Sequence, residues 1–379
     1  MEKWRESSFC IRPFKDLHIT DTGNITPCCL IQNKFFEGKV SEYKKSKVLL
    51  DFQKYFLRGD KHTFCNYCWE LESAGVKSQR QQDSINRRPR VHIRFSNKCN
   101  FKCRICNPTF SSAIGKENKI IKTLDNISNE ERELNNEILK DLVESMPLPV
   151  LLDISGGEPF LSKSHFNFLK YLLKKVDTSQ IDINYNTNLS TLKYKNKNLT
   201  DIWKHFGDII VAVSVDGFGR ETEYSRKGFN WSNFNRNLDT LLLWRSQNLH
   251  KNFITFTTVV SIYSIYGLPD LLIYLRQKTE NSKINLEWCY QPCFLNPQTL
   301  PDTEKSKIKR LYIEKYNLVW DRDRHILDEV LAILYDRNHK IENIEEQRIK
   351  FIDYTNALDK HRKDNFLEVY PQFKDWINK

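Results

Sequence analysis

Three cysteines lie close together in the sequence at a spacing that suits a metal site, Cys-x3-Cys-x2-Cys, formed by Cys99, Cys103 and Cys106. Thiolates bind zinc and iron-sulfur clusters. A structural zinc site usually takes four protein ligands, so a local set of three is better suited to a 4Fe-4S cluster with one open iron. The alternatives are three buried cysteines without metal, or a zinc site whose fourth ligand lies elsewhere.

Four further cysteines nearer the N-terminus form a second candidate metal site: Cys10, Cys28, Cys65 and Cys68. Residues 17–25 alternate around Asp21-Thr22-Gly23, which predicts a β-hairpin that brings Cys10 and Cys28 close together. The Cys65-x2-Cys68 pair then supplies two more ligands. Four thiolates close a coordination shell, and a zinc knuckle remains an alternative to an iron-sulfur cluster.

Length and composition indicate a large soluble protein. The 379 residues suffice for a barrel of about 200 to 250 residues with additions at both ends. No apolar run reaches the roughly 18 residues that cross a membrane, and the N-terminus does not resemble a signal peptide. We therefore expect a cytoplasmic protein with no membrane partner, in which the ten cysteines are reduced or bound to metal.

The formal net charge of +11 raises the question of a nucleic-acid partner. The lysines are scattered through Lys- and Asn-rich segments, and no arginine-rich stripe is present. A nucleic-acid partner is therefore an alternative that the charge alone does not favour.

The hydrophobic pattern of the sequence changes after a polar stretch at residues 78–90, which we interpret as a linker. Six strand patterns then alternate with helical patterns, which predicts parallel βα units. The strands are expected at residues 91–96, 150–155, 181–185, 209–215, 253–260 and 284–290, and the helices at 130–145, 165–175, 199–205, 233–246 and 268–278. From residue 300 the pattern is helical. We predict an α/β fold: a small cysteine-rich domain at 1–88, a partial (β/α)6 TIM-type barrel at 89–299, and a helical extension at 300–379.

Candidate chemical residues fall at the carboxyl ends of these strands, where barrels carry their active sites. The second strand ends in Gly156-Gly157-Glu158-Pro159, whose glycines expose backbone groups that can hydrogen-bond an ammonium. Asn188 follows the third strand, and Ser214 and Asp216 end the fourth. Each of these residues could instead be an ordinary turn former.

The cysteine triplet within Cys-Asn-Phe-Lys-Cys-Arg-Ile-Cys, followed by the Gly-Gly-Glu-Pro turn, resembles the radical S-adenosylmethionine (radical SAM) superfamily. Many members have an aromatic residue where this chain has Ile105. The resemblance implies S-adenosylmethionine at the open iron, its amino group at the 156–159 turn, and cofactor contacts from Asn188, Ser214 and Asp216. Arg226, in Tyr224-Ser225-Arg226, resembles the arginine that pairs with the cofactor carboxylate.

The N-terminal cysteines resemble the first part of the SPASM domain and its shortened twitch form, in which Cys28 fits the spacing from Gly23 better than Cys29. This resemblance implies one auxiliary 4Fe-4S cluster. Such modules usually follow the barrel, whereas here the module precedes it.

The resemblance implies that the reduced cluster passes one electron to S-adenosylmethionine, which breaks to give a 5'-deoxyadenosyl radical. This radical abstracts hydrogen from a substrate. We expect a peptide or small-molecule substrate and a reducing electron-donor protein. Radical modification of a nucleotide, nucleic acid or sugar is the second hypothesis, and a non-catalytic metal-stabilised binding protein is the third. Cys289 and Cys293, at the end of the sixth strand, are interpreted as buried apolar residues or as thiols with a chemical role.

Overall fold

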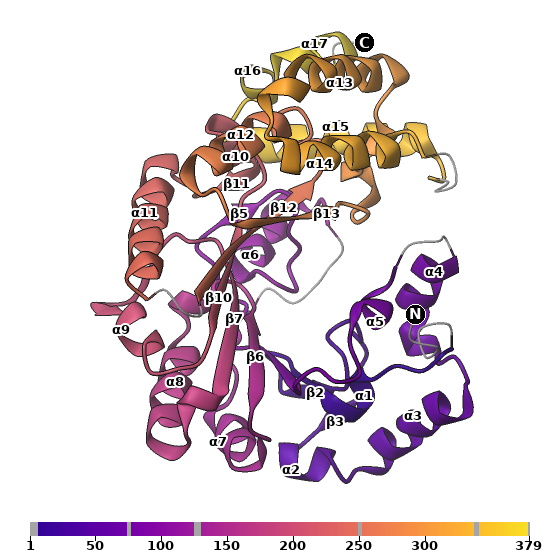
Figure 1. Ribbon diagram of the computed structural model, residues 1–379. Helices are drawn as coiled ribbons and strands as arrows, with labels where there is room; N and C mark the ends of the chain where they lie inside the picture. The colour runs from indigo at the N-terminus through magenta and orange to yellow at the C-terminus, as the bar shows by residue number, and fades with distance from the viewer. Residues whose placement is uncertain (1–6, 74–76, 125–129, 249–251, 337–340, 378–379) are drawn as a thin grey trace.

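A nine-stranded sheet forms the centre of the computed structural model, which describes residues 7–73, 77–124, 130–248, 252–336 and 341–377 (Figure 1). The strand order is β13-β12-β10-β7-β6-β4-β1-β2-β3. Six neighbouring parallel strands make the partial barrel: β4 (Arg90–Arg94), β6 (Val150–Ser155), β7 (Ile181–Thr187), β10 (Ile209–Ser214), β12 (Asn252–Val260) and β13 (Lys283–Trp288). All six strands predicted from the sequence are confirmed, as is the α/β fold with a partial barrel.

Alternation along these strands separates an apolar outer face from a more polar inner face. In β10, Val211 and Val213 are buried in the main core with Leu238 and Leu241 of α11 (Trp231–Gln247). Burial of each such side chain contributes about 1.5 to 3 kcal/mol to folding. The other helices of the barrel are α6 (Ser112–Ile121), α7 (Asn136–Ser145), α8 (Lys163–Lys175), α9 (Thr200–Trp203), α10 (Arg220–Ser225) and α12 (Leu268–Lys278).

The N-terminal unit continues the barrel sheet. The predicted hairpin is present as β1 (Leu17–Ile19) and β2 (Asn24–Thr26), and β3 (Phe36–Glu37) extends it. Strand β1 also pairs in parallel with β4, with Leu17 opposite Val91. The helices of this unit are α1 (Arg12–Lys15), α2 (Val40–Tyr43), α3 (Lys47–Arg58), α4 (Asn66–Ser73) and α5 (Gln79–Gln82).

The polar stretch interpreted as a linker is a packed segment. It contains α5, in which Arg80 is only 3% exposed. The guanidinium of Arg80 donates to the carbonyl oxygens of Ser7 and Phe9, both at 2.7 Å, and forms an ion pair with Glu72. The stretch connects the N-terminal unit to the barrel, and buried ion pairs and backbone contacts satisfy its charged groups.

The C-terminal extension is helical, as predicted, and lies beside the β12 and β13 edge of the sheet (Figure 1). Ile326, Leu327, Val330 and Leu334 form one apolar face and are buried in a second core. Its helices are α13 (Asp302–Lys315), α14 (Asp321–Leu334), α15 (Ile344–Arg362), α16 (Phe366–Val369) and α17 (Lys374–Ile377). Among the described residues, none of the helices combines the length and hydropathy that a membrane crossing requires.

Candidate active site

The cysteine triplet lies in the loop after β4, at the carboxyl end of the barrel strands. Part of this loop forms β5 (Lys102–Cys103), which pairs with β11 (Arg226–Lys227) and places Cys103 opposite Arg226. The N–H of Cys106 donates to the carbonyl oxygen of Cys103 at 3.1 Å. Burial raises the pKa of all three thiols, that of Cys106 to about 12. A positively charged centre is therefore needed to hold them as thiolates.

Gly156 and Gly157 bring the turn after β6 into close contact with the cysteine loop. A Cβ on Gly156, which has φ of +132°, would lie 2.4 Å from the carbonyl oxygen of Ser96, and one on Gly157 would lie 2.2 Å from that of Lys98. The N–H groups of Gly157 and Glu158 donate to these two oxygens, each at 2.8 Å. An ammonium group only donates hydrogen bonds, so the carbonyl oxygens of the turn are the groups suited to it.

Glu158 joins this turn to the end of β7. Its carboxyl group is 1% exposed and accepts hydrogen bonds from the hydroxyl of Thr187 and the N–H of Asn188, both at 2.7 Å. Burial raises the pKa of Glu158 to about 7. The amide Nδ2 of Asn188 donates to Oδ1 of Asn100 at 3.0 Å and lies 3.8 Å from Sγ of Cys99. Glu158 thus positions Asn188 against the cysteine loop, while Pro159 begins the short 3-10 turn Pro159–Leu161.

Asp216 and Arg226 form a buried two-contact ion pair. Nε and Nη2 of Arg226 lie 2.7 and 2.9 Å from the carboxylate oxygens of Asp216. The same carboxylate accepts the N–H of Val259 at 3.0 Å, and Nη1 of Arg226 lies 3.9 Å from Sγ of Cys103. Asp216 therefore fixes the guanidinium beside the cysteine loop, a role that sequence reasoning did not assign to it.

Ser214 is the last residue of β10 and is partly exposed. Alternation places it on the same face as Ile210 and Ala212, which line a wide groove of about 790 Å³. The groove runs along the inner face of the sheet to Trp288 and is also lined by Tyr67 of the N-terminal unit and Glu329 of α14. Ser214 and the groove thus share the inner face of the barrel.

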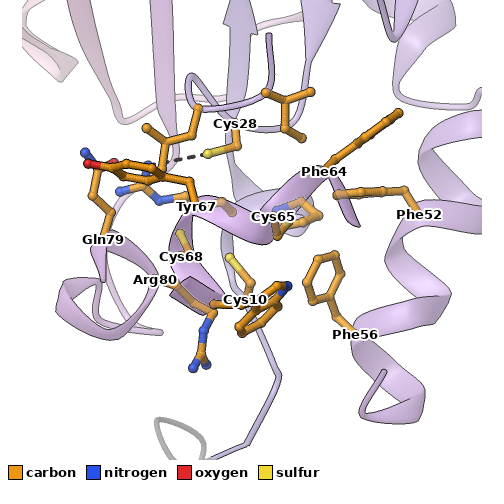
Figure 2. Close-up of a pocket in the computed structure, with 15 residues that line it drawn as sticks. Cys10, Cys28, Phe52, Phe56, Phe64, Cys65, Tyr67, Cys68, Gln79 and Arg80 are labelled. Atoms are coloured by element: carbon orange, nitrogen blue, oxygen red, sulfur yellow. Dashed lines mark hydrogen bonds between the residues drawn. The ribbon is translucent and has the colours of Figure 1, made fainter. Parts of the chain in front are cut away.

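The structure brings the four predicted N-terminal cysteines together around one pocket (Figure 2). Phe52, Phe56 and Phe64 line the same pocket, so its walls are largely apolar. Nη1 of Arg12 lies 3.7 Å from Sγ of Cys28 and 3.9 Å from that of Cys29. Cys28 lines this pocket, whereas Cys29 lines a different cavity on the barrel side.

The donor types at each candidate site are those that iron-sulfur clusters use. In the part of the chain that the structure describes, no three His, Cys, Asp or Glu side chains converge as ligands of a single metal ion. Three thiols at one site and four at the other, with an arginine beside each, match the thiolate ligands and negative charge of such clusters.

Arg104, between the second and third cysteines of the triplet, is a residue that sequence reasoning missed. Its side chain is fully buried and pairs with Asp359 and Asp364, at 2.5 and 3.4 Å. The guanidinium lies 3.7 Å from the ring centroid of Tyr224. The C-terminal extension therefore contacts the cysteine loop directly, and a separation of 255 residues left no signal for this contact in the sequence.

Cys289 and Cys293 lie after β13. Cys289 is 4% exposed, its thiol donates to the carbonyl oxygen of Gln291 at 3.5 Å, and burial raises its pKa to about 12. Cys293 is partly exposed. Cys289 is thus buried in the second core, and Cys293 packs less tightly.

Comparison with known proteins relates most of the barrel to one protein family. Residues 93–269 match the family model described as the Radical SAM superfamily. No curated protein matches the chain. One similar solved structure is histidine-tagged anSMEcpe with bound AdoMet, with a TM-score of 0.43 and 18% identity over 60% of this chain and 58% of that one.

Two further structures were solved with peptides. Native anSMEcpe with bound AdoMet and a peptide has a TM-score of 0.41 and 15% identity over 60% of each chain. Streptococcus suis SuiB bound to precursor peptide SuiA has a TM-score of 0.39 and 13% identity over 84% of this chain and 62% of that one. The chain thus spans about three fifths of the length of these proteins, and at these TM-scores the likeness carries no argument about substrate.

Proposed function

Because residues 93–269, which make up most of the barrel, match the Radical SAM superfamily, we propose that the protein reductively cleaves S-adenosylmethionine and abstracts hydrogen from a substrate. When bound, the 4Fe-4S cluster and S-adenosylmethionine supply the electron transfer and the 5'-deoxyadenosyl radical for this reaction. The observation that carries the proposal is the close contact between the Gly156-Gly157 turn and the cysteine loop, which leaves no room for a side chain at either glycine.

The chain's own residues would hold and orient the two cofactors. Cys99, Cys103 and Cys106 are the proposed cluster ligands, and the carbonyl oxygens of Gly156 and Gly157 are proposed to accept hydrogen bonds from the cofactor's ammonium. Arg226 is proposed to pair with the cofactor carboxylate through Nη1, since its Nε and Nη2 are engaged by Asp216. Its distance of 3.9 Å from Sγ of Cys103 places it beside the proposed cluster.

The polar side chains at the strand ends complete the proposed cofactor site. Asn188 and Ser214 are proposed to contact the ribose hydroxyls. Asp216 is proposed to act through Arg226, because its carboxylate is engaged by the guanidinium and by the N–H of Val259. Glu158 and Pro159 are proposed to hold the turn in place, since the Glu158 carboxyl fixes the backbone of Asn188.

We propose that Cys10, Cys28, Cys65 and Cys68 hold an auxiliary 4Fe-4S cluster. Four thiols from three segments lining one pocket support this assignment, and so does Arg12 beside Cys28, since a guanidinium offsets the negative charge of bound thiolates. The auxiliary cluster would accept or relay an electron. A reducing electron-donor protein is proposed to supply the first electron.

A peptide or small molecule is the proposed substrate. The groove of about 790 Å³ on the inner face of the sheet is large enough for several residues of an extended peptide, and polar side chains such as Asn184, Asn186 and Thr257 line it. The groove reaches from the N-terminal unit to α14, so both additions to the barrel help to shape it.

Anaerobic reconstitution with iron and sulfide tests the reaction class. After reduction with dithionite, we expect the wild-type chain to convert S-adenosylmethionine to 5'-deoxyadenosine and methionine. The Cys99/Cys103/Cys106→Ala triple variant should form neither product while its N-terminal site still holds iron. A wild-type protein that contains both clusters but leaves S-adenosylmethionine intact would overturn the proposed function.

A further inference from the structure

Strand β13 forms one edge of the barrel sheet (Figure 1). It pairs with β12 on one side, and no strand among the described residues pairs with its other side. None of its six residues is buried, whereas β6 and β10 each have four buried residues. The side of β13 away from β12, its open side, therefore presents backbone groups that other barrel strands use for pairing.

The hydrogen-bond pattern shows which backbone groups of β13 face the open side. The N–H of Cys289, directly after the strand, donates to the carbonyl oxygen of Val260 of β12 at 3.0 Å. Backbone groups of successive residues in a strand point to opposite sides, so the odd-numbered residues of β13 pair with β12. Ile284 and Leu286 thus direct their N–H and C=O groups to the open side, where no described residue bonds them.

The wide groove reaches this open side. All six residues of β13 line the groove, although alternate side chains lie on opposite faces of the sheet. Lys283 lies opposite Thr255, which also lines the groove, and is on the inner face. Ile284 lies opposite Phe256 of the main core and is on the outer face. A groove lined by both faces of an edge strand passes around that edge, and so borders the free backbone groups of Ile284 and Leu286.

The two faces at this edge differ in chemistry. On the outer face, Ile284 and Leu286 are partly exposed and share the groove with Ile333 of α14. On the inner face, Lys283 and Glu287 are exposed and charged. Residues of α14 and of α4 both line the groove, so it has room for a single strand between these helices but not for the edge of another folded sheet.

We propose that an extended segment of a peptide substrate adds to the open side of β13 as a further strand, bonded to the backbone groups of Ile284 and Leu286. Its side chains would alternate, with apolar ones towards α14 and polar ones towards the inner face. The inference deepens the proposed function and rests on it, because it selects a peptide over a small molecule as the substrate. The added strand would run beside β13 to the carboxyl end of the barrel strands, where the cysteine triplet lies.

Backbone methylation of a peptide probe tests this mode of binding. The probe is fluorescein-labelled Lys-Val-Thr-Val-Thr-Val-Lys, whose apolar and polar side chains alternate. Two further probes carry an N-methyl group on every valine or on every threonine. A strand pairs with one edge through the N–H groups of alternate residues, so only one of the two methylation patterns removes the donors that face β13. Fluorescence anisotropy of the reconstituted protein measures binding without cleavage of S-adenosylmethionine.

We expect the unmethylated probe to bind the wild-type chain. One methylated probe should bind about tenfold more weakly, equivalent to about 1.4 kcal/mol, and the other within about threefold of the parent. Loss of the valine-methylated probe would indicate an antiparallel strand, and loss of the threonine-methylated probe a parallel one. No binding of the parent probe, or equal binding of the two methylated probes, would overturn the proposal.

Two substitutions at Leu286 test the protein side of the same contact. Leu286→Pro and Leu286→Ala both remove the leucine side chain, but only proline removes the N–H, which an edge strand tolerates on its open side. We expect the parent probe to bind Leu286→Pro about tenfold more weakly than Leu286→Ala. Equal affinities in the two variants would overturn the proposal, as would a wild-type dimer that Leu286→Pro dissociates, because a second copy would then occupy the edge. Should Leu286→Pro fail to fold, the probe series on the wild type decides alone. Binding is measured apart from the cleavage assay, so failure of this proposal is distinguishable from failure of the proposed function.

Discussion

Replacement of Asp359 by alanine is expected to loosen the contact between the C-terminal extension and the cysteine loop. The Asp359 carboxylate accepts a hydrogen bond from Arg104 at 2.5 Å and from the Tyr224 hydroxyl at 2.7 Å, and one from the N–H of Phe366 at 2.6 Å. The variant leaves the fully buried Arg104 guanidinium with Asp364 at 3.4 Å and the Tyr224 ring.

Removing one partner of a buried ion pair typically costs about 3 to 5 kcal/mol. Asp364 retains part of the attraction, so we expect the free energy of unfolding to fall by about 3 kcal/mol. With an m-value of about 3 kcal/mol per M, the urea midpoint measured anaerobically should fall by about 1 M. Iron bound by the cysteine triplet should be lost at a lower urea concentration than in the wild type, because Arg104 lies within that loop.

Asp323→Ala provides the matched control. Asp323 pairs with Arg276, and both side chains are 3% exposed, but this pair joins α12 to α14 and does not contact the cysteine loop. The control should lower the urea midpoint by a similar amount, with iron loss that follows global unfolding. Equal iron loss in the two variants relative to their midpoints, or a change of less than about 1 kcal/mol in Asp359→Ala, would refute the reasoning.

Three further predictions concern the two cluster sites. Gly157→Ala should abolish formation of 5'-deoxyadenosine while N-terminal iron is retained, because a Cβ would lie 2.2 Å from the carbonyl oxygen of Lys98; full activity would contradict the packing argument. Burial raises the pKa of Glu158 to about 7. The stability that the protonated carboxyl contributes to the folded state is therefore present at low pH and is lost as pH rises towards 7. The unfolding free energy of wild type relative to Glu158→Gln should therefore fall by about 3 kcal/mol between pH 4 and 7, and a pH-independent difference would argue against it. Cys28→Ser should remove about four irons per chain and Cys29→Ser none, because only Cys28 lines the thiol pocket; the reverse result would exchange their roles.

Much of the barrel could be predicted because its strands follow local patterns. The apolar runs at residues 150–155 and 209–215 coincide almost fully with β6 and β10, and the cysteine triplet follows the first barrel strand as expected. The hairpin around Gly23 was predicted from turn chemistry, which is also local, and Gly23 has φ of +86°. Helix boundaries were less accurate: the expected helix at 130–145 begins at Asn136, where the Asn135 side chain caps it.

The features that depend on distant contacts could not be predicted. Local alternation predicted the hairpin that contains β1, but the pairing of β1 with β4 joins segments far apart in the chain, which local patterns do not specify. The Arg104–Asp359 contact joins residues far apart in the chain. Asp216 and Arg226 are ten residues apart, yet their pairing depends on how β11 returns against β5, which short-range patterns do not specify. Both carry charge, and composition alone gave no reason to expect their burial.

Low-temperature EPR of the dithionite-reduced protein, recorded with and without S-adenosylmethionine, tests the central assignment most directly. In the wild type, we predict that S-adenosylmethionine changes the g-values of one of two reduced cluster signals, because it binds an open iron held by Cys99, Cys103 and Cys106. The triple alanine variant should retain only the other signal, unchanged by S-adenosylmethionine. A wild-type spectrum that does not respond to S-adenosylmethionine, or a responsive signal that persists in the triple variant, would contradict the assignment.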